Sequence, residues 1–193
     1  MTVHSLSKME QDCLLDIARR AISLAARGQR LPPLAIDSLP DRVKAPGASF
    51  VTLTEGGDLR GCVGALEAYQ SLAEDVWEHA EAAAIHDYRF PPLQEPELPG
   101  VEIEISYLTP PVPLEYDTPA ELLARLRPGV DGVILRDGFH RATFLPQVWE
   151  KLPDPEAFLS HLCEKMGARR DLWRQKRLQV FTYQVESFEE ARR

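Results

Sequence analysis

The sequence has few features of a membrane or secreted protein. No apolar run approaches the roughly eighteen residues of a transmembrane helix. The first residues, Met1 to Ser5, lack the basic and apolar regions of a signal peptide. Only three cysteines are present, Cys13, Cys62 and Cys163, and their odd number and unequal spacing do not suggest a disulfide framework. We therefore expect a reduced, cytoplasmic protein with no membrane association.

Several cofactor and metal motifs are also missing. The sequence contains no phosphate-binding Gly-x-x-x-x-Gly-Lys, no His-Glu-x-x-His and no Cys-x-x-Cys pair. It has no closely spaced cysteine triad for an iron–sulfur cluster, so the chain is not itself a radical enzyme. His79 and His86 lie two helical turns apart, and we expect both to be solvated surface residues. The sequence therefore predicts no metal site and identifies no cofactor.

Positive charge is scarce. The chain has 22 lysines and arginines against 30 acidic residues, a formal net charge of −8. Nucleic-acid binders usually carry a basic patch, so this balance disfavours a nucleic-acid partner and leaves an RNA-associated role as the weakest option. The 193 residues are 44% hydrophobic and 27% charged, which is ordinary for a globular protein able to bury a core.

An internal repeat is the main feature that is present. Strand patterns near 49–54 and 58–64 flank a Gly-Gly turn, and similar patterns near 132–136 and 139–145 flank an Asp-Gly turn. Each hairpin is followed by a helical pattern and then by a strand-like run, 101–107 in the first copy and 178–185 in the second.

Helix start signals complete the prediction. Capping boxes at Ser7 and Ser71 begin helices of about 8–27 and 72–86, while Thr118-Pro119 and Asp154-Pro155 begin two more. The sequence therefore predicts a single α+β domain over 1–193. It comprises two related strand–strand–helix–strand lobes, about 49–108 and 130–188, and an extra N-terminal helix. Prolines 110, 111 and 113 mark the seam between the lobes.

Three segments resemble, in order, the signature segments of the AMMECR-one family, whose bacterial form is the AmmeMemoRadiSam system protein A. They are Leu59-Arg60-Gly61-Cys62-Val63-Gly64, Asp87-Tyr88-Arg89-Phe90-Pro91-Pro92-Leu93 and Phe144-Leu145-Pro146-Gln147-Val148. The resemblance covers about residues 8 to 188. It implies a two-lobed α+β fold with a cleft between the lobes. It also implies association with a Memo-like protein and a radical S-adenosylmethionine enzyme as partners.

Cys62 is the candidate catalytic nucleophile. Alternate strand residues share a face, so Arg60, Cys62 and Gly64 point one way. A nearby arginine favours the thiolate form of a cysteine, and Arg60 is two residues away. Gly61 and Gly64 would let a ligand or another backbone approach closely. The alternative is that Cys62 is simply packed, because cysteine is among the most buried residue types.

The repeat places Arg141 and Thr143 at the positions of Arg60 and Cys62. If a local two-fold axis relates the hairpins, all four side chains line one cleft. Asp87 and Arg89 are candidate ligand contacts, or else an internal ion pair that fixes their loop with Phe90 as its plug.

Gln147 is a candidate ligand contact or a turn-stabilising residue, because its amide both donates and accepts hydrogen bonds. We expect a protein that binds a small anionic molecule in the cleft and is a candidate thiol-dependent enzyme. The alternative is a non-catalytic adaptor that docks a partner protein through the same motifs.

Overall fold

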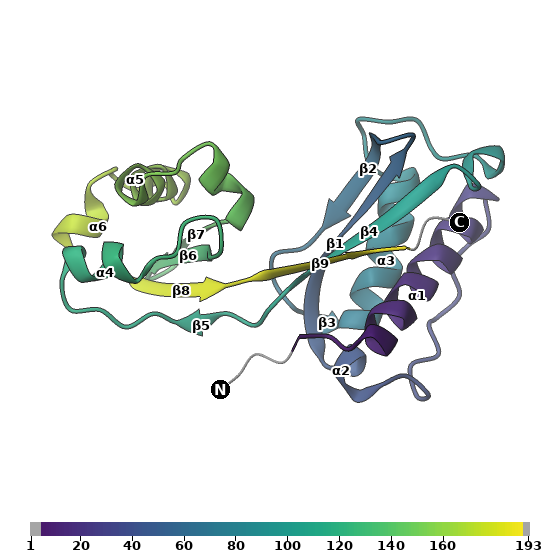
Figure 1. Ribbon diagram of the computed structural model, residues 1–193, viewed down its shortest axis with the longest axis horizontal. Coiled ribbons are helices and arrows are strands. Elements are labelled where there is room, and N and C mark those ends of the chain that lie inside the picture. Colours follow the sequence, from purple (N-terminus) through teal and green to yellow (C-terminus); the bar gives the residue numbers. More distant parts are fainter. Residues whose placement is uncertain (1–4, 191–193) are drawn as a thin grey trace. The chain divides into compact units, whose positions relative to one another are not determined.

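The computed structural model describes residues 5–190 (Figure 1). The chain forms two compact units: unit 1 runs to Leu108 and resumes at Glu186, and unit 2 is Thr109–Val185. The first boundary, after Leu108, lies two residues before Pro110, the first proline of the predicted seam. Within residues 5–190, no helix combines the length and apolar character needed to cross a bilayer.

The helices of unit 1 begin where the sequence predicts. α1 (Lys8–Ala26) and α3 (Leu72–Ile85) both have complete capping boxes, in which Ser7 pairs with Glu10 and Ser71 with Glu74. In each box the serine oxygen accepts a free backbone N–H of the first turn, and the glutamate accepts the N–H of the serine. A short α2 (Asp41–Lys44) and a 3-10 turn η1 (Glu95–Glu97) complete the helical segments of the described part of unit 1.

The unit 1 sheet is antiparallel. Within the described residues it contains β1 (Pro46–Glu55), β2 (Asp58–Gly64), β4 (Val101–Leu108) and β9 (Val185–Glu189) in the order β2-β1-β4-β9, and β3 (Gln70–Ser71) also pairs with β1. Helices α1 and α3 lie on the same side of this sheet (Figure 1).

Alternation along 50–54 of β1 and 101–105 of β4 gives this part of the sheet one apolar and one polar face. The apolar side chains form the core with α1 and α3; they include Val51, Leu53, Ile103 and Ile105. Thr52, Thr54, Glu102 and Glu104 alternate with them and remain half-buried or exposed.

Unit 2 has its own sheet and core. Its described strands are β5 (Val112–Pro113), β6 (Gly132–Asp137), β7 (His140–Phe144) and β8 (Gln179–Tyr183), in the order β5-β8-β6-β7. Its helical segments are α4 (Pro119–Arg125), η2 (Pro146–Glu150), α5 (Pro155–Lys165) and α6 (Leu172–Gln175). The predicted caps Thr118 and Asp154 both accept backbone N–H groups of their first turns.

The predicted α+β class is confirmed, and each unit has the order strand, strand, helix, strand. In both, the third strand pairs antiparallel with the first strand of the hairpin: β4 with β1, and β8 with β6. This shared order agrees with an internal duplication, which stays a hypothesis.

The last strand differs from the prediction. The run predicted as 178–185 is part of two strands, β8 and β9, which belong to different sheets. The break is at Gln184, which exchanges hydrogen bonds with Thr109: its N–H donates to Thr109 Oγ1 and its carbonyl accepts the Thr109 N–H, both at 2.8 Å. Residues 186–188, predicted as the end of the second lobe, continue into the unit 1 sheet, and Phe188 joins the unit 1 core.

Candidate functional site

Cys62 lies on β2, an edge strand of the unit 1 sheet, directly opposite Thr52 of β1. The Thr52 hydroxyl donates to the Cys62 sulfur at 3.3 Å. The main-chain N–H and C=O of Cys62 are bound by the loop after α3. Thr52 and Cys62 therefore form a non-hydrogen-bonded cross-strand pair, the kind in which side chains approach most closely. The cysteine is half-buried.

Asp87 and Arg89 bind the outer edge of β2. The Asp87 carboxylate accepts the N–H of Cys62 at 2.9 Å, and Arg89 Nη2 donates to the carbonyl of Cys62 at 3.2 Å. The two side chains are joined by an Nε–Oδ1 bond of 2.9 Å and an Nη2–Oδ2 bond of 2.6 Å. This ion pair satisfies the polar groups that a neighbouring strand would otherwise bind. We call it the Asp87–Arg89 fork.

The ion pair of the fork favours the charged forms of both Asp87 and Arg89. Hydrogen bonds from Arg89 are the largest cause that lowers the pKa of Asp87 well below its usual range; the N–H groups of Cys62 and Arg89 add to this, and burial opposes it. The same side-chain bond raises the pKa of Arg89, with smaller contributions from the charges of Asp87, Cys62 and Tyr88. The internal ion pair anticipated as one alternative is thus formed, while a ligand role for Asp87 and Arg89 stays a prediction.

The loop around the fork is anchored differently from the prediction. Leu93, and not Phe90, enters the unit 1 core; Phe90 is half-buried, with the Arg89 guanidinium 5.4 Å from its ring centroid. Tyr88, between the two fork residues, is 96% exposed. The loop therefore presents an aromatic ring to solvent beside the fork.

Arg60 sits at a β-bulge. Leu53 pairs with Gly61 and Thr54 with Leu59, which leaves Arg60 as the extra residue of β2. Its guanidinium binds Glu97 at 2.8 Å and 3.3 Å and donates to the carbonyl of Pro91 at 3.0 Å. These side-chain bonds are the main reason that the pKa of Glu97 is lowered. The guanidinium that contacts Cys62 is therefore that of Arg89, and Arg60 is bound to a glutamate that sequence reasoning did not identify.

The motif glycines are explained by close packing. A Cβ atom on Gly61 would lie 2.1 Å from the backbone oxygen of Ala83 in α3, and one on Gly64 would lie 2.3 Å from the oxygen of Ser49. The sequence analysis predicts that these glycines allow close approach of a ligand or of another backbone. In the structure, Gly61 and Gly64 accommodate another backbone. Contact of either glycine with a ligand stays a prediction.

Arg141, Thr143 and Gln147 belong to unit 2. Arg141 is half-buried and lies opposite Arg136 in the β6–β7 ladder. The Thr143 hydroxyl bonds with the Tyr183 hydroxyl at 3.1 Å, and Gln147 is exposed on η2. The arrangement of Arg60, Cys62, Arg141 and Thr143 in one cleft stays a prediction.

The histidine prediction was wrong for His79, which is only 8% exposed. His79 Nδ1 lies 3.2 Å from a carboxylate oxygen of Asp75, and the same carboxylate accepts the Ser49 hydroxyl at 2.6 Å. His79 follows Val76 by three residues and precedes Ala83 by four, so helical spacing could have placed it on the buried face. Among residues 5–190, no three or more histidine, cysteine, aspartate or glutamate side chains are grouped to hold a metal ion.

The chain is similar to proteins of several archaea. A family model described as AMMECR1 matches residues 15–188. A protein of Methanothermobacter thermautotrophicus is 40% identical over 189 residues, which cover 96% of each chain. Protein MJ0810 of Methanocaldococcus jannaschii is 35% identical over 181 residues, 90% of this chain and 87% of that protein. The crystal structure of uncharacterized protein PH0010 from Pyrococcus horikoshii matches with a TM-score of 0.74 at 31% identity, covering 96% of this chain and 93% of that one.

Proposed function

The chain belongs to the AMMECR1 family, and from the geometry around Cys62 we propose that unit 1 binds a small anionic ligand and acts on it through the Cys62 thiol. The observation that carries the proposal is the way in which Cys62 is held. Both of its main-chain polar groups are bound by the Asp87–Arg89 fork, while its sulfur accepts a hydrogen bond from the Thr52 hydroxyl and the residue is half-buried. A fixed sulfur with a hydrogen-bond donor, on a residue that is not fully buried, is suited to nucleophilic chemistry.

Arg89 is the better anion contact of the two motif arginines. Its side chain is 43% exposed, against 12% for Arg60. The bonds of Arg89 to Asp87 and Cys62 use Nε and Nη2, and a guanidinium has five N–H donors, so the Nη1 donors can serve a carboxylate or phosphate. Arg60 instead uses all three nitrogens within the loop, which suits a positioning role.

In the proposed chemistry, the Cys62 thiol loses its proton to solvent and the thiolate adds to a carbonyl carbon of the ligand. The S–C bond forms as the C=O π bond opens, and the resulting alkoxide oxygen takes up a proton from solvent. Thr52 donates a hydrogen bond to the sulfur. Family resemblance supports a cytoplasmic role with a Memo-like protein and a radical S-adenosylmethionine enzyme, which would supply or consume the ligand.

A second candidate is a non-catalytic adaptor that docks a partner protein. The exposure of Tyr88 beside the fork favours it, because aromatic residues are enriched at protein interfaces. In this case Tyr88, and not the sulfur, makes the important contact.

Metabolite capture tests the first proposal. Immobilised wild-type protein is incubated with a cell extract, and the retained small molecules are identified by mass spectrometry. We expect an anionic compound that is lost with Arg89→Gln and is retained but not converted with Cys62→Ser. Cys13→Ser, which changes another half-buried cysteine, is the matched control and should behave as wild type.

The same panel separates the two candidates. Retention of the same compounds by wild type and by both site variants would contradict the ligand site. Loss of a bound protein partner with Tyr88→Ala, together with its full retention by Cys62→Ser, would favour the adaptor.

A further inference from the structure

The two edges of the unit 1 sheet are built differently. β2 forms one edge and β9 the other, in the order β2-β1-β4-β9. On β2, the Asp87–Arg89 fork binds the main chain of Cys62, and the bulge at Arg60 interrupts the regular pairing. Both features keep a further strand from pairing with an edge. β9 contains no proline, so each of its residues has a main-chain N–H.

Ser187 and Glu189 turn their main-chain groups away from β4. The Glu190 N–H donates to the carbonyl of Ile103 at 3.1 Å, and the hydroxyls of Ser187 and Ser106 are 2.9 Å apart. Both contacts fit one antiparallel register between the two strands. Hydrogen-bonded and non-hydrogen-bonded pairs alternate in such a ladder, so Ser187 and Glu189 belong to non-hydrogen-bonded pairs. Their N–H and C=O groups therefore face outward.

This outer edge of β9 is open within the part of the chain that the structure describes. Ser187 and Glu189 are both exposed. Among residues 5–190, no strand, loop or side chain binds their outward N–H and C=O groups. A row of such groups is a template for another strand, and peptides that bind in this way gain affinity from main-chain hydrogen bonds.

Charge at this edge favours a basic strand. The register pairs Glu189 with Glu104, and both residues are exposed. Like charges directly opposite each other destabilise a sheet, and a cation on the other side of Glu189 would offset this repulsion. A second copy of β9 would instead bring further carboxylates to the edge. The charges therefore select a lysine or an arginine opposite Glu189.

The neighbouring positions set the rest of the pattern. Phe188 points to the opposite face and joins the unit 1 core, so an apolar side chain suits the position beside it. Ser187 is exposed on the polar face, where a small polar side chain matches its hydroxyl. The pairings of β1 with β2, β3 and β4 are all antiparallel. An added antiparallel strand therefore reads basic, apolar, small polar from its N-terminal side.

We propose that the outer edge of β9 binds an extended basic segment of another protein by antiparallel strand addition. A lysine or arginine of that segment lies opposite Glu189, an apolar residue opposite Phe188 and a small polar residue opposite Ser187. This surface includes neither Cys62 nor the fork, so the inference does not depend on the proposed thiol chemistry.

An NMR titration with the acetylated and amidated peptide Val-Lys-Val-Thr-Val tests the proposal. We expect the amide signals of Ser187 and Glu189 to shift, and that of Cys62 to stay in place because its N–H is already bound by Asp87. Methylation of the threonine nitrogen of the peptide removes the donor to the Ser187 carbonyl and should weaken binding roughly tenfold. Glutamate in place of the peptide lysine should weaken binding roughly fivefold.

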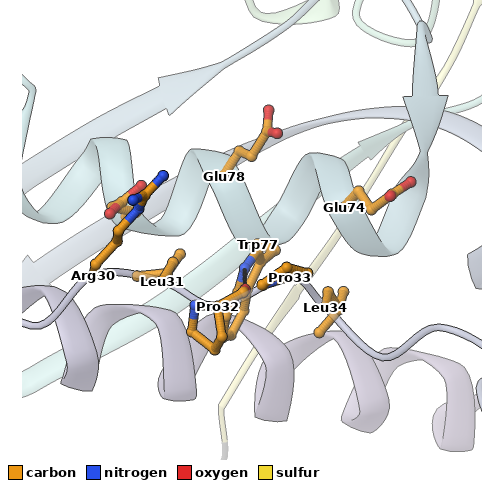
Figure 2. Close-up of a pocket in the computed structure, with 9 residues that line it drawn as sticks. Arg30, Leu31, Pro32, Pro33, Leu34, Glu74, Trp77 and Glu78 are labelled. Carbon is orange, nitrogen blue, oxygen red and sulfur yellow. Dashed lines mark hydrogen bonds between the residues drawn. The ribbon is translucent and has the colours of Figure 1, made fainter.

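A second acidic surface of unit 1 is the internal control. A cavity of about 610 Å³ lies between the segment 30–34 and α3, and in Figure 2 Glu74, Trp77 and Glu78 project from the helix. The Trp77 indole N–H donates to the carbonyl of Pro32 at 3.1 Å and gives a separate NMR signal. Attraction between charges alone would bring the peptide to this cavity as well, whereas strand addition at β9 leaves the Trp77 signal in place.

Variants of β9 test the same contacts from the protein side. Ser187→Ala and Ser187→Pro both lose the hydroxyl contact with Ser106, but only proline removes the outward N–H, which makes no bond to β4. We expect Ser187→Ala to keep the wild-type affinity and Ser187→Pro to bind roughly tenfold more weakly. Glu189→Lys should reverse the preference, so that the glutamate peptide binds better than the lysine peptide.

Unmoved amide signals of Ser187 and Glu189 would overturn the proposal. So would equal affinities of Ser187→Ala and Ser187→Pro, with urea unfolding showing that both variants are folded, or a titration that moves the Trp77 signal instead. Shifts of the same amides that depend on protein concentration, without any effect of the peptide, would identify a second copy as the occupant and would likewise contradict it.

Discussion

The edge strands of the two units bind a cation at matching positions. In unit 1 the carbonyl of Cys62 on β2 accepts a hydrogen bond from Arg89 at 3.2 Å. In unit 2 the carbonyl of Thr143 on β7 accepts one from Lys165 Nζ at 2.9 Å. The predicted repeat aligns Cys62 with Thr143, and both cations come from the chain after the hairpin. Each unit thus satisfies the same edge carbonyl with a positive side chain.

The side chains at these positions are used differently. The Thr143 hydroxyl bonds to the Tyr183 hydroxyl. The same Tyr183 hydroxyl donates to the carbonyl of Phe144 at 3.2 Å. Burial raises the pKa of Tyr183, so this network stays neutral. Cys62 has Thr52 as its hydrogen-bonding partner and is half-exposed, and the N–H of Cys62 is bound by a carboxylate. In unit 2 this side chain belongs to a hydrogen-bond network with a tyrosine, whereas in unit 1 it is the half-buried thiol that we propose as the reactive group.

The residue before the compared position is Gly61 in unit 1 and the buried Ala142 in unit 2. Adding a methyl group at Gly61 should cause the largest loss of stability. Gly61→Ala would place a Cβ 2.1 Å from the backbone oxygen of Ala83, which can move only if α3 shifts. We expect a loss of about 3 kcal/mol in the free energy of unfolding, measured by urea denaturation. Gly100→Ala is the control, because its Cβ meets the flexible Glu55 side chain at 3.1 Å and should cost far less. Equal losses for the two variants would refute the packing account.

Asp87→Ala should have the next largest effect. It leaves the N–H of Cys62 without an acceptor and Arg89 without its carboxylate, and we expect a loss of about 2 kcal/mol in unfolding free energy. Lys165→Met removes a contact with one edge carbonyl of unit 2 and should cost less. A larger loss of unfolding free energy in Lys165→Met than in Asp87→Ala would contradict the proposal that the fork stabilises its edge strand more than Lys165 does. Thermal and urea denaturation of both variants measure the comparison.

Acid should reduce the contribution of the fork. Because the pKa of Asp87 is lowered by folding, its stabilisation is fully present above the ordinary aspartate pKa of about 4 and is lost as pH falls through the folded value. The difference in unfolding free energy between wild type and Asp87→Asn should be constant above about pH 5 and shrink below about pH 4. Glu97 titrates in both proteins and cancels in this difference. A difference that grows on acidification would contradict the lowered pKa of Asp87.

The smallest expected effect is on the Thr143 network. Thr143→Val keeps the shape of the side chain and removes its hydrogen bond with Tyr183, so we expect a loss of about 1 kcal/mol or less. Ligand capture by unit 1 should be unchanged if Thr143 has only this structural role. Loss of capture with an intact fold would instead support the predicted contribution of Thr143 to the ligand site.

The sequence predicts features that are local in the chain. The capping boxes at Ser7 and Ser71 and the turn at Gly138 depend on neighbours within a few residues, and each is present as predicted. The split between β8 and β9 depends on Thr109, which is 75 residues from Gln184 in sequence. Nothing in the alternating pattern of 178–189 marks that change of sheet.

The sequence identifies several residues of the candidate site, but it does not predict which side chains bind one another. Cys62, Asp87 and Arg89 were identified from the motifs, and the structure brings them together. The partner of Arg60 is Glu97, 37 residues away in sequence, and a bulge re-aims the arginine toward it. Sequence spacing alone predicts that Arg60 lies beside Cys62 on the same face, because it assumes a regular strand without a bulge.

The accessibility of the Cys62 sulfur is tested most directly by the rate of alkylation in the native protein. Iodoacetamide labelling followed by peptide mass spectrometry gives separate rates for Cys62, the half-buried Cys13 and the buried Cys163. We expect Cys62 to react fastest, because burial raises the pKa of the Cys13 thiol and of the Cys163 thiol and so lowers their reactivity. A Cys62 rate no greater than that of Cys163, with the protein fully folded, would contradict the proposed thiol site.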